Sequence, residues 1–185
     1  MSIPNLLAFA RLILTPVAMI LIMRSPGSRH MAFVAAIVFA VAALTDFLDG
    51  YLARRWQITT SLGAFLDTVA DKVLVTGTLI ALVEIGTTST WAAFIIIGRE
   101  LTVMGLRSVA ALDQSTVPPS WWGKSKATIQ FVAITLAILQ LDIVIGPLRL
   151  DQWAMAAAVV VTVLSAGDYF ARFRSVLTGK RSGAG

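Results

Sequence analysis

Six apolar segments, each close to the length of a membrane span, follow one another along this chain and constrain its fold more than any other feature. The segments cover Ile3–Met23, Met31–Arg54, Ser61–Val83, Trp91–Val109, Ser125–Leu141 and Trp153–Phe173. With 57% apolar residues and only 14% charged ones, a chain of 185 residues has too little polar surface to cover a soluble domain. The sequence therefore predicts an all-α integral membrane protein with six transmembrane helices.

The connections between these segments contain residues that disfavour helix, among them Pro26-Gly27, Gly86, Pro118-Pro119 and Gly146-Pro147. No internal repeat or low-complexity linker divides the chain. We expect one six-helix membrane domain over residues 1–175, followed by a basic and disordered cytoplasmic tail over residues 176–185.

The basic residues are unequally divided between the two sides that six spans would define. The side with both termini receives nine of them: Arg54, Arg55, Arg107, Lys124, Lys126, Arg172, Arg174, Lys180 and Arg181. The other side receives Arg24, Arg29 and Arg149. The positive-inside rule then predicts cytoplasmic termini and a multi-pass protein of the inner membrane. Because the cations follow the membrane ends, the net charge of +5 indicates contact with anionic lipid rather than nucleic acid.

Charged residues interrupt every apolar segment. No stretch free of Asp, Glu, Lys and Arg exceeds 16 residues, as in Gln152–Gly167, whereas a spanning helix needs about 20. Ionisable residues must therefore lie within the membrane, where they are costly and usually functional. They are the first candidates for a site.

Four acidic residues form two helical stripes. Asp46 and Asp49 are three positions apart, which places them about 60° apart on a helix. Asp67 and Asp71 are four positions apart on the next segment, so they also share one face. Because the connection is short, we expect the two helices to be antiparallel neighbours with facing carboxylates near their cytoplasmic ends.

Four facing carboxylates repel one another, and two divalent cations would neutralise them. Oxygen ligands without Cys or a nearby His favour Mg²⁺ or Mn²⁺, and a pair of such ions is suited to displacement at phosphorus. A single carboxylate at a helix end is usually a cap or a solvated charge. From another class of protein, an ion-coupled transporter or proton relay also places acids within spans and stays an alternative.

The stretch from Asp46 to Asp71 resembles the signature of the CDP-alcohol phosphotransferase family. It reads Asp-x2-Asp-Gly-x2-Ala-Arg-x8-Gly-x3-Asp-x3-Asp and matches at every specified position. The resemblance implies the six-helix fold of that family and a homodimeric enzyme that transfers a substituted phosphate from a CDP-linked donor to an alcohol, releasing CMP.

The resemblance also implies roles for individual residues. Asp46, Asp49, Asp67 and Asp71 would hold two divalent metals, and Asp71 would also be the catalytic base. The CDP donor would be bound by Asn5, Asp49, Gly50, Ala53, Arg54, Thr60, Gly63 and Asp67.

Further elements resemble the branch of the family that makes phosphatidylglycerol phosphate: Ile3-Pro4-Asn5 with Arg11, Asp71-Lys72, Arg99-Glu100, and Trp122-Gly123-Lys124 with Lys126 and Gln130. This branch uses CDP-diacylglycerol and sn-glycerol 3-phosphate as substrates. Phosphatidylglycerol, giving cardiolipin, and inositol phosphate are alternative acceptors.

Cations apart from the metal site are needed for the phosphate of the acceptor. The candidates are Arg107, Lys124, Lys126 and Arg172, although each could instead be an interfacial cation that reaches lipid head groups. We expect Asp168 to pair with Arg172 one turn away. For Arg99 and Glu100 a buried structural pair is as plausible as a substrate role, and Arg11 has no assigned role.

Overall fold

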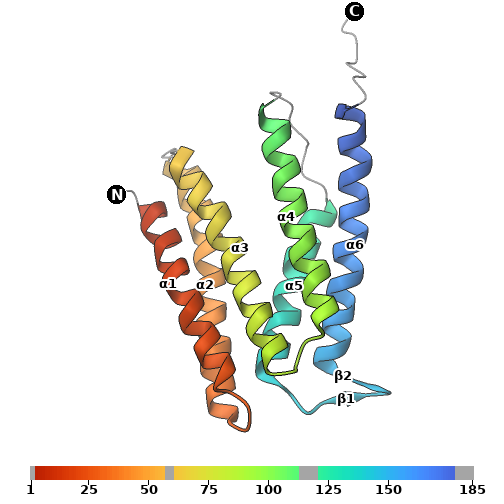
Figure 1. Cartoon of the computed structure of the whole chain (residues 1–185). Coiled ribbons are helices and arrows are strands. Elements are labelled where there is room, and N and C mark those ends of the chain that lie inside the picture. The colour runs from red at the N-terminus through yellow and green to blue at the C-terminus, as the bar shows by residue number, and fades with distance from the viewer. Residues whose placement is uncertain (1–2, 57–60, 113–120, 178–185) are drawn as a thin grey trace, which may run out of the picture.

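The computed structural model describes residues 3–56, 61–112 and 121–177, which form six long helices (Figure 1). These are α1 Ile3–Met23, α2 Arg29–Trp56, α3 Ser61–Glu84, α4 Thr90–Leu112, α5 Trp121–Leu139 and α6 Leu150–Leu177. Each apolar segment of the sequence thus forms one helix. Gly27 and Gly86 adopt positive φ between helices, a conformation that glycine tolerates without strain.

The fold is all-helical, as predicted, apart from a small hairpin between α5 and α6. Strands β1 Val144–Ile145 and β2 Leu148–Arg149 pair antiparallel around Gly146, whose φ is +63°. Glycine in this left-handed conformation followed by Pro147 reverses the chain tightly enough for the flanking backbones to pair. The hairpin lies at the end of the bundle opposite the start of α1 (Figure 1).

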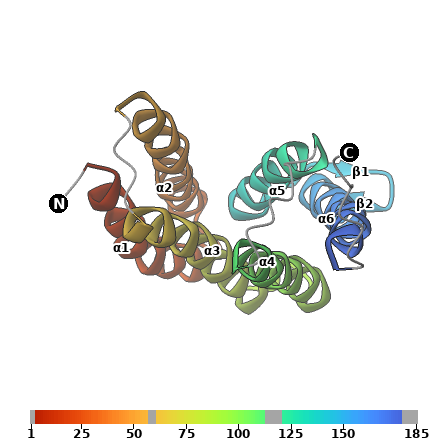
Figure 2. The same cartoon turned by 90° about the horizontal axis from the view of Figure 1, so that it is seen from above.

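The helices form two groups of three, seen side by side from above in Figure 2. In the first group α1 packs along both α2 and α3, and in the second α6 packs against α4 and α5. The groups meet where α2 contacts α5 and α3 contacts α4. At the first of these contacts the rings of Phe39 and Phe131 stack with centroids 4.9 Å apart. The main core of buried side chains extends across this junction, with Leu74, Ile96 and Ile134 among its members.

Small residues let α1 and α3 approach closely. A Cβ atom on Gly77 would lie 2.8 Å from Sδ of Met19 and 2.9 Å from Cγ2 of Thr15, both distances shorter than side chains normally allow. Close backbone approach at small residues is typical of helix pairs in membranes. It brings the polar residues of α1 within reach of α3.

Two helices are long and apolar enough to cross a membrane among the described residues, over Leu6–Met23 of α1 and Leu150–Phe173 of α6. Only 28% and 22% of these windows are buried inside the protein, so most of their side chains are at least partly exposed. Outward apolar faces are expected where lipid is the solvent. Shorter apolar stretches occupy α2 and α5. A sixfold crossing of the membrane stays a prediction.

Candidate functional site

Asp67 and Asp71 lie on one face of α3, within its first three turns. Their side chains are 42% and 37% exposed, which leaves carboxylate oxygens accessible at the end of the bundle where α1 begins. The four-residue spacing therefore places both acids on a common stripe, as the sequence predicts. Gly63 precedes them in the first turn of the same helix.

Asp46 and Asp49 lie in the last turns of α2, the helix that precedes α3 and runs antiparallel to it (Figure 1). The two helices are in contact. Several predicted site residues have side chains outside the described part of the structure: Asn5, Asp46, Asp49, Gly50, Ala53, Arg54, Thr60 and Lys124. The proposed meeting of the four acids and the donor pocket stay predictions.

Arg11 connects the three helices of the first group around Asp67. Its side chain is completely buried, and Nη1 lies 3.3 Å from Oδ1 of Asp67. On the other side Nε donates to the carbonyl of Ala42 at 3.2 Å and to Oγ1 of Thr45 at 3.5 Å. Thr45 immediately precedes Asp46 in the chain. Arg11 therefore compensates the charge of Asp67 and fixes α3 relative to the acidic end of α2.

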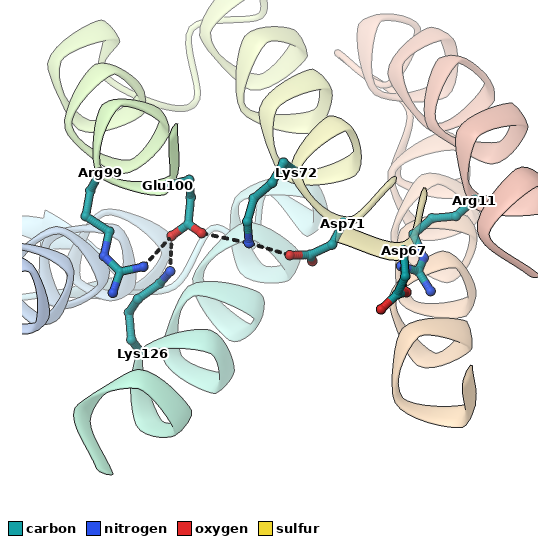
Figure 3. A network of polar contacts seen from close by, with 7 residues as sticks. All are labelled: Arg11, Asp67, Asp71, Lys72, Arg99, Glu100 and Lys126. Atoms are coloured by element: carbon teal, nitrogen blue, oxygen red, sulfur yellow. Dashed lines mark hydrogen bonds and ion pairs between the residues drawn. The ribbon is translucent and has the colours of Figure 1, made fainter. Parts of the chain in front are cut away.

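A second polar network surrounds Glu100, at the middle of α4 (Figure 3). Its carboxylate, 6% exposed, lies 2.8 Å from Nζ of Lys72 and 3.2 Å from Nη1 of Arg99. Nζ of Lys126 on α5 also pairs with it. The same Nζ of Lys72 lies 2.5 Å from Oδ2 of Asp71. One buried carboxylate thus gathers three cations from α3, α4 and α5.

The two networks meet around a pocket at the junction of the helix groups. Its polar wall contains Arg11, Asp71, Lys72, Glu100 and Lys126, together with the amide of Gln130. Its apolar wall contains Phe39, Ala43, Leu74, Val75, Ala127, Phe131 and Ile134. In such a pocket the carboxylate can accept a proton while the ammonium groups bind an anion.

The chemistry of the available ligand atoms decides whether a metal ion fits beside Asp67 and Asp71. Among the side chains that the structure describes, no group of three Asp, Glu, His or Cys residues could hold a metal ion. Asp67 and Asp71 supply accessible carboxylate oxygens, which suit a hard divalent cation. A complete ligand set therefore needs more ligands than the described side chains supply, and Asp46 and Asp49 of α2 stay the predicted ones. The described half fits Mg²⁺ or Mn²⁺ in the type of its ligands.

The predicted cations for an acceptor phosphate have different surroundings. Lys126 is buried, lines the pocket and pairs with Glu100. Arg172 pairs with Asp168 at 3.1 Å, which confirms the expected pair one turn apart. Arg107 lies over the ring of Tyr169, 5.8 Å from its centroid, a cation–π contact. Neither of these arginines is among the described residues that line the pocket.

The pocket is also lined by Arg11, Lys72, Glu100 and Gln130. The sequence predicts no catalytic or binding role for Arg11, Lys72 or Gln130, and for Glu100 a substrate role is one of two interpretations. The sequence offers a buried ion pair between Arg99 and Glu100 as one of two interpretations, and the structure shows this pair. Lys72 and Lys126 are further partners of Glu100. The available signal was that charges within apolar segments must find partners. Which residues are partners depends on helix packing, which spacing alone does not specify.

Comparisons with known proteins agree with the signature. The family model described as CDP-alcohol phosphatidyltransferase matches residues 1–164. A protein of Mycobacterium tuberculosis strain H37Rv called probable phosphatidylglycerophosphate synthase is 38% identical, over 99% of this chain and 87% of its own length. Proteins called CDP-diacylglycerol--glycerol-3-phosphate 3-phosphatidyltransferase are also similar. That of Bacillus subtilis strain 168 is 34% identical over 92% of this chain and 94% of its own. That of Haemophilus influenzae strain Rd is 43% identical over 72% of this chain and 73% of its own length.

Proposed function

The chain belongs to the CDP-alcohol phosphatidyltransferase family, and we propose that it transfers the phosphatidyl group of CDP-diacylglycerol to sn-glycerol 3-phosphate, giving phosphatidylglycerol phosphate and CMP. The relatives that carry the name of this reaction match most of the chain. The observation that carries the proposal is the pocket in which Asp71 lies beside the cations of the Glu100 network.

Asp71 is the proposed base. As the primary hydroxyl of glycerol 3-phosphate attacks the phosphorus that bears diacylglycerol, its proton passes to the Asp71 carboxylate. The new P–O bond forms while the P–O bond to CMP breaks, and CMP leaves with the electron pair. Lys72, 2.5 Å from Asp71, orients its carboxylate.

The phosphate of the acceptor is bound by the ammonium groups that face the pocket. Lys126 and Lys72 reach it from α5 and α3, and Glu100 orients both. Arg107, Lys124 and Arg172, at the same end of the bundle, provide further positive charge that attracts an anionic substrate.

Asp46, Asp49, Asp67 and Asp71 would hold two divalent cations, Mg²⁺ or Mn²⁺. When bound, these ions would stabilise negative charge on the phosphoryl oxygens and on the leaving CMP. Arg11 holds Asp67 in place through their ion pair. The remaining donor-binding residues are Asn5, Gly50, Ala53, Arg54, Thr60 and Gly63.

A location at the cytoplasmic surface of the inner membrane suits these substrates. Diacylglycerol tails must enter from lipid, whereas glycerol 3-phosphate and CMP are soluble in water. The pocket lining includes Asp71 near the start of α3 and Lys126 near the start of α5. Both helices begin toward the end of the bundle where α1 begins and α6 ends (Figure 1). We propose six spans, cytoplasmic termini and a homodimer.

The decisive experiment is an acceptor panel. Purified protein in detergent micelles receives CDP-diacylglycerol, Mg²⁺ or Mn²⁺, and one of glycerol 3-phosphate, phosphatidylglycerol or inositol phosphate. CMP release with glycerol 3-phosphate is expected, and a chelator should stop it. Preference for another acceptor would overturn the assignment of the substrate. If no acceptor leads to CMP release, the proposal that the protein is an enzyme is wrong, and an ion-coupled transporter is favoured.

A further inference from the structure

Gln130 brings an unpartnered hydrogen-bond donor to the wall of the pocket. The residue is on α5 and only 4% exposed, and its Nε2 atom is buried without a hydrogen-bond partner. It nevertheless lines the pocket. Buried amide groups almost always have a partner, because removing them from water without one is unfavourable. An unpartnered donor at a pocket wall therefore indicates a partner that arrives with a ligand.

The position of Gln130 within the pocket narrows the identity of that ligand. It is one helical turn beyond Lys126, on the same face of α5. Phe131, the next residue, stacks on Phe39 and forms part of the apolar wall. Gln130 thus lies where the charged wall of the pocket gives way to its apolar wall. A neutral amide suits a neutral polar group of the ligand.

The chemistry of glycerol 3-phosphate supplies such a group. Its phosphate matches the ammonium groups of Lys126 and Lys72, and its attacking hydroxyl matches Asp71. The hydroxyl on C2 takes no part in bond making and still needs a hydrogen-bond partner. We propose that Nε2 of Gln130 donates to this C2 hydroxyl and so makes Gln130 a specificity-determining residue for the acceptor. This inference rests on the proposed function.

The test compares two acceptors that differ only at C2. One is sn-glycerol 3-phosphate, and the other is 3-hydroxypropyl phosphate, which lacks the C2 hydroxyl. The wild-type enzyme should prefer the first in kcat/KM by about tenfold or more, because losing the hydroxyl leaves the amide unpaired. In Gln130→Leu the preference should fall to nearly one through a lower kcat/KM for glycerol 3-phosphate, with an unchanged KM for CDP-diacylglycerol.

A stability measurement separates this role from a structural one. Since Nε2 has no partner in the protein, replacing the amide by leucine should leave the melting temperature in micelles unchanged or higher. Thr162→Val is a matched control, since Oγ1 of Thr162 is also buried without a partner on α6 but is not at the pocket. It should leave the acceptor preference unchanged.

Three results would overturn the proposal. These are equal use of both acceptors by the wild type, a wild-type preference retained in Gln130→Leu, and an equal loss with both acceptors together with a lower melting temperature. Gln130→Met provides a second variant of similar length if the leucine variant does not fold. Failure of the proposed function looks different, because the wild type would then release no CMP with either acceptor.

Discussion

The ammonium group of Lys72 lies 2.8 Å from a carboxylate oxygen of Glu100, and this ion pair joins α3 to α4 beside the proposed base. The same ammonium group contacts Asp71, and Glu100 also contacts Lys126 of α5. A single chain of charges therefore connects the proposed proton acceptor to the proposed phosphate-binding cation. Changes at Glu100 should affect stability and acceptor binding together.

Glu100→Gln should destabilise the protein strongly. The substitution keeps the shape of the side chain but removes the one carboxylate shared by Lys72, Arg99 and Lys126. Breaking a buried ion pair in this way costs roughly 3–5 kcal/mol. Equilibrium unfolding in mixed micelles measures it. Asp168→Asn, which breaks the more exposed pair with Arg172, should cost less than about 1 kcal/mol. Equal effects would contradict a buried network.

Asp71→Asn should abolish turnover while CDP-diacylglycerol still binds at least partly. The amide cannot accept the hydroxyl proton, and general bases contribute about 10²–10⁴-fold to rates. CMP release measures turnover, and calorimetric titration with the donor measures binding. A variant with nearly normal turnover would remove Asp71 from the role of base.

Gly77→Ala should separate α1 from α3. The added methyl would lie 2.9 Å from Cγ2 of Thr15, a β-branched side chain with little freedom in a helix, so overpacking should cost about 1–3 kcal/mol. Gly98→Ala, where a Cβ meets nothing within 4 Å, is the control and should be neutral or stabilising. The measurement is again unfolding in micelles. Adding Thr15→Ser, which removes that methyl, should restore part of the loss.

The extent of the helices could be predicted from sequence because the signals are local. Apolar length specifies a span, and turn residues such as Pro26-Gly27 and Gly86 specify where it ends. The hairpin around Gly146 was missed because two-residue strands have no periodicity to detect.

The site could be predicted only in part. The spacing of Asp67 and Asp71 predicts one stripe because a helix fixes which neighbours share a face. The partner of Arg11 could not be derived in this way. Asp67 is 56 positions away along the chain, and their contact depends on how α1 packs against α3. Pairing of Glu100 with Lys126, from two other helices, has the same origin.

The orientation of the bundle can be tested with single cysteines, because the natural chain contains none. His30→Cys lies at the start of α2, and Ala111→Cys lies at the opposite end of the bundle, at the end of α4; both positions are exposed. In intact cells only His30→Cys should react with a membrane-impermeant maleimide. Both should react once the membrane is permeabilised. The reverse pattern in intact cells would place the pocket on the outer side.

Lys126→Met should weaken the binding of the acceptor and leave the binding of the donor unchanged. Lys126 faces the pocket one helical turn from Gln130, and Glu100 holds its ammonium group in place. A charge-assisted hydrogen bond to phosphate is worth about 1.5–3 kcal/mol, which corresponds to roughly 10- to 150-fold in the KM for glycerol 3-phosphate. The KM for CDP-diacylglycerol should stay unchanged, since no residue assigned to the donor lies on α5. Arg29→Gln, at the opposite end of the bundle with a side chain 93% exposed, is the matched control and should alter neither constant. If Lys126→Met raises both constants equally, Lys126 supports the packing of α5 against α4 and does not bind the acceptor.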